Sequence, residues 1–398
     1  MKREILLLSF IISKALYGFS AEVSSDTAVY LITCAPGTAT YSIYGHSALR
    51  IVIPEKQTDI VYNWGVFDFN TSNFVWKFAK GRLNYKLDTS SINSFLQEYF
   101  YEKRSVWSQR INLEGDETIR LISLINENLK PENIYYRYDF FYDDCSTRIR
   151  DLLEKAVDNK LIYPPEVSRN IPTFRWKVGE YQKFFPWLKM GVDLIMGRPG
   201  DKKASFRDRM FLPIDLQQNL AKAMVGREHK MMPLLQNART ILAFDPPLIK
   251  TNFYTTPVFV FTLVFILIIF LSAMLRKSRI INIIDIIIFS FFAVLSILMI
   301  FFNFFTDHQQ MKWNINIIWF NPFVIICLFC LLFRKEGEIW FRLAFYFSAL
   351  FLPLLIFIPN SINNSFIPLI FILTLRSSAR GKFSWNPFST GLTTGIDN

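Results

Sequence analysis

Five apolar segments after residue 256 set the strongest limit on what this chain folds into. They cover residues 257–275, 280–305, 317–333, 339–358 and 366–375. The first four have the roughly 17–25 residues that a helix needs to cross the hydrocarbon core of a bilayer. The fifth has only about ten strongly apolar residues, so five spans, or four spans and an interfacial segment, both fit. We therefore predict a membrane domain of about five helices over residues 257–376, preceded by a soluble front half.

Charges between the apolar segments predict how the chain is oriented. Basic residues follow the first segment at 276–279 and the third at 334–335, whereas the loop at 306–314 is nearly neutral. Lys and Arg mark cytoplasmic loops. This rule places the front half outside the cell's inner membrane and the tail, residues 377–398, in the cytoplasm. The net charge of +11 also suits a domain that works against anionic lipid.

The first 21 residues predict the same orientation independently. Lys2 and Arg3 precede an apolar core at 5–12, and small residues follow at 18–21. This order is typical of a secretory signal peptide. The front half shows no basic helix or RNA-binding aromatic motif, so we expect membrane lipids and no nucleic acid as partners.

The front half shows mixed strand and helix patterns over residues 22–160. Alternating or continuous apolar runs predict strands at 28–33, 46–53, 59–67 and 105–113, and we expect the second and third to form a hairpin. Helical spacing predicts helices at 92–102 and 114–128. Residues 161–256 are rich in proline with scattered basic and aromatic residues, and we interpret them as a helical extension and membrane-proximal linker.

Cys145 is the candidate nucleophile. An aromatic run at 138–142 ends at Asp143 and Asp144, and a helical pattern then begins. A cysteine at a helix N-terminus has its thiolate favoured by free backbone N–H groups and by the helix dipole. The alternative is a half-buried structural cysteine. A disulfide with Cys34 would silence it.

His46 is the candidate base, because thiol acyl-transfer chemistry needs a group that takes and returns a proton. It is the one histidine in the well-patterned part of the front half and precedes an alternating strand. Asn63, on the next predicted strand, is our candidate for orienting the imidazole, with Tyr62 and Asp68 behind it. Asn63 turned to solvent at a polar edge is the alternative.

Other polar residues near these motifs have two interpretations each. Arg148 and Arg150 are able to hold a phosphate or headgroup, or to pair with neighbouring aspartates. His308 is either a second functional histidine near the membrane surface or an interfacial residue beside Trp313 and Trp319. The three histidines show no metal-ligand spacing, and no glycine-rich phosphate loop is present, so we predict no metal and no cofactor.

Together, these motifs resemble one family. The stretches YGHSALRI at 44–51, YNWGVFDF at 62–69 and YDFFYDDCSTRIRD at 138–151 are similar to those of Lnb-type lipoprotein N-acyltransferases, and residues 308–322 resemble the membrane part. The resemblance implies an α+β circularly permuted papain-like (NlpC/P60-like) periplasmic domain, followed by an all-α multi-span domain. It also implies Cys145 as nucleophile and His46 as base.

The implied reaction moves an acyl chain from a phospholipid donor to the free α-amine of a diacylglyceryl-cysteine lipoprotein acceptor. We place Tyr44, Arg148, His308 and Trp313 near the substrates. Two alternatives stay open. One is a membrane-tethered cysteine peptidase or amidase that acts on cell-wall peptides with the same two residues. The other is a non-enzymatic envelope scaffold that binds lipid.

Overall fold

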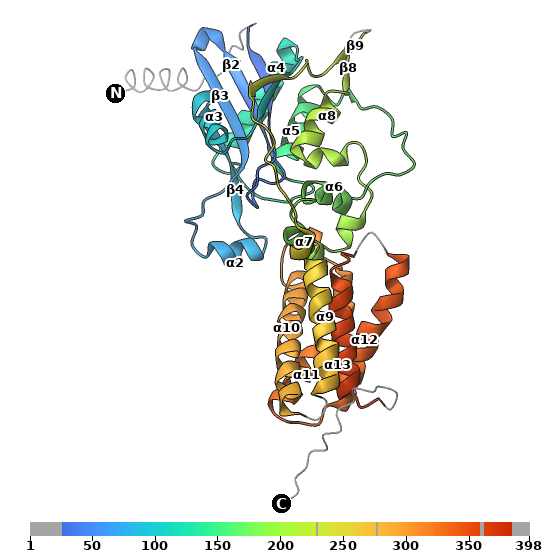
Figure 1. The fold of residues 1–398 in the computed structure, drawn as a ribbon. Helices are drawn as coiled ribbons and strands as arrows, with labels where there is room; N and C mark the ends of the chain where they lie inside the picture. The colour runs from blue at the N-terminus through green and yellow to red at the C-terminus, as the bar shows by residue number, and fades with distance from the viewer. Residues whose placement is uncertain (1–25, 228–229, 276–277, 359–361, 384–398) are drawn as a thin grey trace, which may run out of the picture.

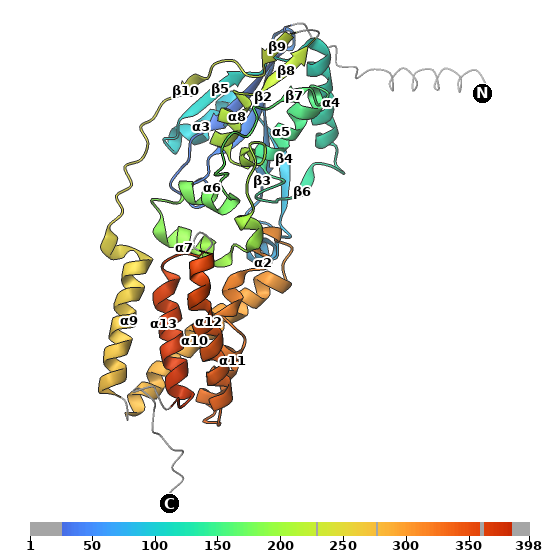
Figure 2. The ribbon, with the colours of Figure 1, turned by 90° about the vertical axis from the view of Figure 1, so that its right-hand side faces the viewer.

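A sheet domain stands on a helical bundle in the computed structural model (Figure 1). The structure describes residues 26–383 apart from 228–229, 276–277 and 359–361. The predicted signal peptide at 1–21 and most of the predicted tail lie outside the described residues. Figure 2 shows the same two parts after a quarter turn, with the sheet domain above the bundle in both views.

A seven-stranded sheet, in the order β10-β5-β1-β2-β3-β4-β6, forms the core of the front half, and all its neighbouring strands are antiparallel. The predicted strands at 28–33, 46–53 and 59–67 are confirmed, as is the hairpin between β2 and β3. The sequence analysis missed β4 and β6. The strands are β1 Ala28–Cys34, β2 His46–Ile53, β3 Thr58–Val66, β4 Asn84–Ser91, β5 Val106–Arg110, β6 Tyr135–Arg137 and β10 Arg239–Leu242.

Three helices cover the two faces of this sheet. α4 (Gly115–Leu129) and α5 (Cys145–Ala156) pack on one face around Trp64, and α3 (Ile92–Tyr101) covers the other. The predicted helices at 92–102 and 114–128 are therefore confirmed. Their starts follow from local capping: the Ser91 hydroxyl accepts the N–H of Ser94, and a capping box opens α4.

The extension after residue 160 combines helices with short strands. It contains α6 (Phe174–Tyr181), α7 (Pro186–Ile195) and α8 (Pro213–Leu220), as well as a three-stranded sheet. That sheet is made of β7 Leu161–Ile162, β8 Met224–Arg227 and β9 Lys230–Pro233. Because β10 returns to pair with β5, the extension also completes the edge of the main sheet.

Four segments of the described chain are long and apolar enough to cross a membrane. They are α9 Pro257–Met274, α10 Arg279–Phe304, the segment Ile315–Leu332 and α12 Glu338–Phe357. The third begins as a 3-10 turn, Ile315–Ile318, and resumes as α11, Phe323–Leu332, after Pro322. The third span therefore lies where the sequence predicts it, but it is not one continuous helix, because proline lacks the N–H that a helix interior needs.

The fifth apolar segment forms α13, Phe366–Arg380, five residues longer than its apolar run. The extra turn carries Arg376 and Arg380, and both meet Asp285 of α10. Arg376 Nε and Nη2 lie 2.6 and 2.9 Å from the carboxylate oxygens, and Arg380 Nε lies 2.5 Å away. Asp285 lies near the beginning of α10, whereas Phe301 near its end contacts Trp76 of the front half. The end of α13 and the sheet domain therefore lie at opposite ends of the bundle.

Loops join the bundle firmly to the front half through α7. The side chain of Asn314 donates to the Leu194 carbonyl at 2.7 Å, and the N–H of Gly197 donates to the Gln310 carbonyl at 2.7 Å. Asn363, before α13, donates to the buried carboxylate of Asp193 at 2.8 Å. These bonds come from both loops that face the sheet domain. They therefore fix the distance between that domain and the spans.

Candidate functional site

Cys145 is the first residue of α5, as the sequence predicts, and Asp144 is the N-cap. The N–H groups of Ser146 and Thr147 both donate to Asp144 Oδ1 at 2.8 Å, while the Thr147 hydroxyl accepts the Asp144 N–H at 2.8 Å. This reciprocal capping box explains why the sequence Asp-Cys-Ser-Thr begins a helix. It also places the thiol in the first turn of α5, where the N–H groups of Ser146 and Thr147 are already bonded to the Asp144 carboxylate.

The thiol itself is enclosed. Cys145 is only 7% exposed, and Ser146 Oγ lies 3.8 Å from its sulfur. Burial raises the pKa of Cys145, although the backbone N–H of Ser47 and the Ser146 side chain act to lower it. The sequence predicts a lowered pKa for Cys145, and this prediction was wrong. The desolvation of the thiolate raises the pKa by more than the helix N-terminus lowers it. The resting group is a neutral thiol that needs a base.

His46 and Asn63 form a pair on neighbouring strands. His46 is the first residue of β2, and its Nε2 lies 2.5 Å from Oδ1 of Asn63 on β3. With the amide oxygen as acceptor, Nε2 carries the proton and Nδ1 keeps its lone pair. Burial lowers the pKa of His46, whereas the Asn63 bond and the nearby Asp144 raise it. The imidazole is thus neutral near neutral pH and able to accept a proton at Nδ1.

The strand that carries His46 also borders the thiol. The residue after His46, Ser47, directs its N–H at the Cys145 sulfur, and its hydroxyl accepts from Ser146 at 3.4 Å. No hydrogen bond joins the imidazole to the thiol within the described residues. Catalytic hydrogen bonds are often formed only once substrate is bound. The structure therefore brings the three predicted catalytic residues into one region without a preformed thiol–imidazole bond.

Gly65 is a site residue that the sequence analysis did not single out. It sits at an irregularity of β3 with φ +91°, a conformation that favours glycine. A Cβ at this position would lie 3.5 Å from the Tyr138 ring and 4.0 Å from the Cys145 Cβ. A glycine inside a strand pattern signals a bulge or a close approach, and Trp-Gly-Val within β3 carries that signal.

Tyr44 and Arg148 are tied to the protein rather than free. The Tyr44 hydroxyl accepts from Gln182 of the extension at 2.7 Å, and burial raises its pKa to about 12. Arg148 makes two bonds to Asp143, at 2.5 and 2.9 Å, and its guanidinium lies 3.5 Å from the centre of the Tyr136 ring. Of the two interpretations of Arg148, the structure shows the one in which it pairs with a neighbouring aspartate, Asp143. Substrate contacts of both residues stay a prediction.

His308 and Trp313 lie in the loop between the second and third spans. His308 Nε2 lies 2.8 Å from the carbonyl oxygen of Phe78, so this histidine docks the loop against the front half. Trp313 is 80% exposed and has φ +55°. The same loop reaches the turn before the thiol, because the Gln310 side chain donates to Asp139. Neither residue is placed against Cys145, and substrate contact by either one stays a prediction.

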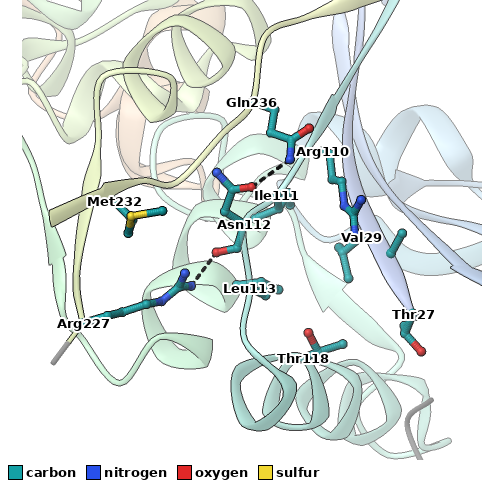
Figure 3. A pocket seen from close by; sticks show the side chains of 11 residues that line it. Thr27, Val29, Arg110, Ile111, Asn112, Leu113, Thr118, Arg227, Met232 and Gln236 are labelled. Atoms are coloured by element: carbon teal, nitrogen blue, oxygen red, sulfur yellow. Dashed lines mark hydrogen bonds between the residues drawn. The ribbon is translucent and has the colours of Figure 1, made fainter. Parts of the chain in front are cut away.

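Two features of the described chain bear on metal binding and disulfide formation at the site. No cluster of three or more His, Cys, Asp or Glu that would hold a metal occurs among the residues between 26 and 383 that the structure describes, and Cys34 and Cys145 are both free thiols. A hollow of about 540 Å³ lies between the start of β1, the end of β5 and Arg227, but none of the predicted site residues lines it (Figure 3).

Comparison with known families gives two matches. The family described as the Lnb N-terminal periplasmic domain matches residues 17–178, which include His46, Asn63 and Cys145. The family described as the Lnb transmembrane domain matches residues 249–383, which include all five helices of the bundle. No curated protein and no solved structure matches the chain.

Proposed function

This chain belongs to the Lnb family, with a periplasmic N-terminal domain and a transmembrane domain, and from that premise we propose that it is a cysteine-dependent lipoprotein N-acyltransferase. One observation carries the proposal. The buried thiol, the imidazole and the amide lie in a domain that hydrogen bonds clamp onto the spans. Substrates embedded in the outer leaflet of the inner membrane would meet such a site directly.

In the first step, the unprotonated Nδ1 of His46 takes the proton of the Cys145 thiol as the sulfur attacks the ester carbonyl of a phospholipid. The new C–S bond forms and the ester C–O bond breaks. His46 then returns its proton to the departing alkoxide, which leaves as a lysophospholipid. The backbone N–H groups of Cys145 and Ser47, which lie at the sulfur, are suited to hold the oxyanion.

In the second step, the α-amine of a diacylglyceryl-cysteine lipoprotein attacks the thioester. His46 takes a proton from the amine, the C–N bond forms, and the C–S bond breaks. The proton passes to the thiolate and restores the resting thiol. Because burial raises the pKa of Cys145, the thiol is protonated again at neutral pH after each turnover. The amide of Asn63 keeps the imidazole in the tautomer that both steps require.

For the fold we propose a permuted papain-like arrangement. Its support is a helix that begins with the cysteine and packs on an antiparallel sheet, together with a histidine that starts a strand earlier in the chain. For the orientation we propose that the C-terminal end of α13 faces the cytoplasm, since it lies at the opposite end of the bundle from the periplasmic domain.

Mass spectrometry of a reporter lipoprotein's N-terminal peptide tests the proposal. The protein is expressed in cells depleted of their own N-acyltransferase, as wild type, Cys145→Ala or Cys34→Ala. Cys34 is the matched control, because it is also a free, buried thiol of the sheet domain. We expect a third acyl chain with wild type and Cys34→Ala and a free amine with Cys145→Ala. A free amine in all three, with normal expression, contradicts the proposal and directs attention to cell-wall peptides.

A further inference from the structure

Partly exposed aromatic rings form a continuous row at one end of the sheet. From the membrane side, the rings of Phe78 and Phe74 have centroids 6.2 Å apart, and Phe74 lies 5.8 Å from Phe67. Phe67 is 5.2 Å from Tyr85, and Tyr85 is 4.7 Å from Tyr138. We call these five residues the aromatic path. Each step is within the range of a direct ring contact.

The upper end of the aromatic path reaches the thiol. Tyr138 lies beside Gly65, where a Cβ would approach both the Tyr138 ring and the Cys145 Cβ. Because Gly65 has no side chain, position 65 places no side chain between the last ring and the nucleophile. The positive φ of this residue keeps larger side chains out.

The lower end of the aromatic path reaches the level of the bilayer. Phe74 and Phe78 belong to α2, Phe74–Ala79, at the lower edge of the sheet domain beside the end of α10 (Figures 1 and 2). Trp76 of the same helix stacks near Phe301 of α10, with ring centroids 5.6 Å apart. Val75, Trp76 and Phe78 are all more than half exposed, so this apolar surface continues that of the spans.

Basic side chains accompany the apolar surface of α2. Lys80 lies 4.8 Å from the centre of the Trp76 ring, and Lys77 is on the same helix. Aromatic rings and lysines together are typical of an element that lies in the interface of a membrane with anionic headgroups. The face therefore fits the outer leaflet.

We propose that the aromatic path is the binding site for the donor acyl chain, which runs from the thiol at Tyr138 down to α2 in the leaflet. This inference rests on the proposed function, because it identifies the binding surface of the same site. With the carbonyl at Cys145, the first methylenes lie against Tyr138 and Tyr85, and the methyl end lies against Phe74 and Phe78. The partly exposed rings become covered only when the chain is bound.

Photocrosslinking locates the chain without turnover. Full-length Cys145→Ala protein is placed in nanodiscs of phosphatidylethanolamine and phosphatidylglycerol. These contain phosphatidylethanolamine with a diazirine either next to the ester or near the methyl end. We expect the first probe to label the peptide with Tyr138 and the second to label the peptide with Phe74 and Phe78. Label confined to α9–α13, or the same label on α2 from both probes, overturns the inference.

A chain-length series adds a readout that separates this inference from the proposed function. We expect Tyr85→Ser to lower the transfer of a sixteen-carbon chain relative to a six-carbon chain by about tenfold, because apolar contact with the chain is lost. Tyr101→Ser, on the exposed face of α3, is the matched control and leaves the ratio unchanged. An unchanged ratio in Tyr85→Ser overturns the aromatic path while transfer itself stands. Labelled rings without any lipoprotein transfer would overturn the proposed function alone.

Discussion

Two buried polar regions of the molecule treat their charges in opposite ways. In the bundle, Asp285 is fully buried and receives both Arg376 and Arg380, while Arg376 also donates to Ser272 at 2.8 Å. In the sheet domain, buried Cys145 has only weak polar neighbours, and His46 is held by a neutral amide. The difference separates two uses of burial. The bundle pairs its buried charges between helices, whereas the sheet domain holds a thiol and an imidazole in their neutral forms, as the proposed proton transfer requires.

Removing the base should have the largest effect. We expect His46→Ala to lower acyl transfer by roughly 10²–10⁴-fold, the usual contribution of a general base. Quantitative mass spectrometry of the reporter peptide measures it. Because the loss is chemical, the melting temperature should stay near that of wild type. If His46→Ala is stable and fully active, His46 is not the base, and its role is structural like that of the charged residues in the bundle.

Breaking the charge cluster of the bundle should have a large effect of another kind. We expect Asp285→Ala to destabilise the protein by about 3–5 kcal/mol, because the buried guanidinium of Arg376 and the partly buried one of Arg380 lose their partner. Thermal melting in detergent measures the loss, and the folded fraction should keep its activity. Replacing all three residues with apolar ones of similar size should recover most of the stability. Activity lost from well-folded Asp285→Ala would show that this cluster has more than a structural role.

Changing the partner of the imidazole should move the pH profile in two directions. The acid limb of the activity follows His46, whose pKa burial lowers and Asn63 raises. Activity therefore rises as pH rises through a value below 6.5. Asn63→Asp adds a negative charge that favours the imidazolium, so the limb moves up by about one unit or more. Asn63→Leu removes the hydrogen bond, and the limb moves down. The same limb in all three proteins would contradict His46 as the titrating base.

The smallest effect is expected at the surface contact between the two domains. Arg82 and Asp307 form an exposed ion pair at 2.8 Å, and such pairs contribute little and are screened by salt. Arg82→Ala should leave the melting temperature and acyl transfer within experimental scatter of wild type. Asp193→Ala, which removes the buried partner of Asn363 at the same junction, is the contrasting variant and should lower stability clearly.

Local patterns were enough for much of this protein. The apolar segments, the hairpin of β2 and β3, and the helices after Ser91 and Glu114 all follow from periodicity and capping over a few residues. The position of Cys145 follows in the same way, since Asp144 and Thr147 cap the helix that begins there. Such signals are readable because hydrophobic period and cap chemistry involve residues close together in the chain.

Other features depended on residues that are distant in sequence. The strand at 239–242 pairs with β5 more than a hundred residues earlier, and four residues carry too little pattern to predict it. α13 continues past its apolar run, and the added turn is stabilised by the bonds that Arg376 and Arg380 donate to the Asp285 carboxylate of α10. Arg148 was left with two interpretations, and only the fold supplied Asp143 and the Tyr136 ring together.

The sequence by itself determined that a front domain of strands and helices precedes a multi-span bundle, and that a cysteine begins a helix after a histidine-led strand. Only the tertiary structure decided the state of that cysteine and where it lies relative to the spans. The reason is physical. A helix terminus acts locally and favours the thiolate, but burial in the fold raises the pKa of Cys145 by more than the N–H of Ser47 lowers it. The junction through Asp193 and Asn314 then holds the thiol at a set height above the spans.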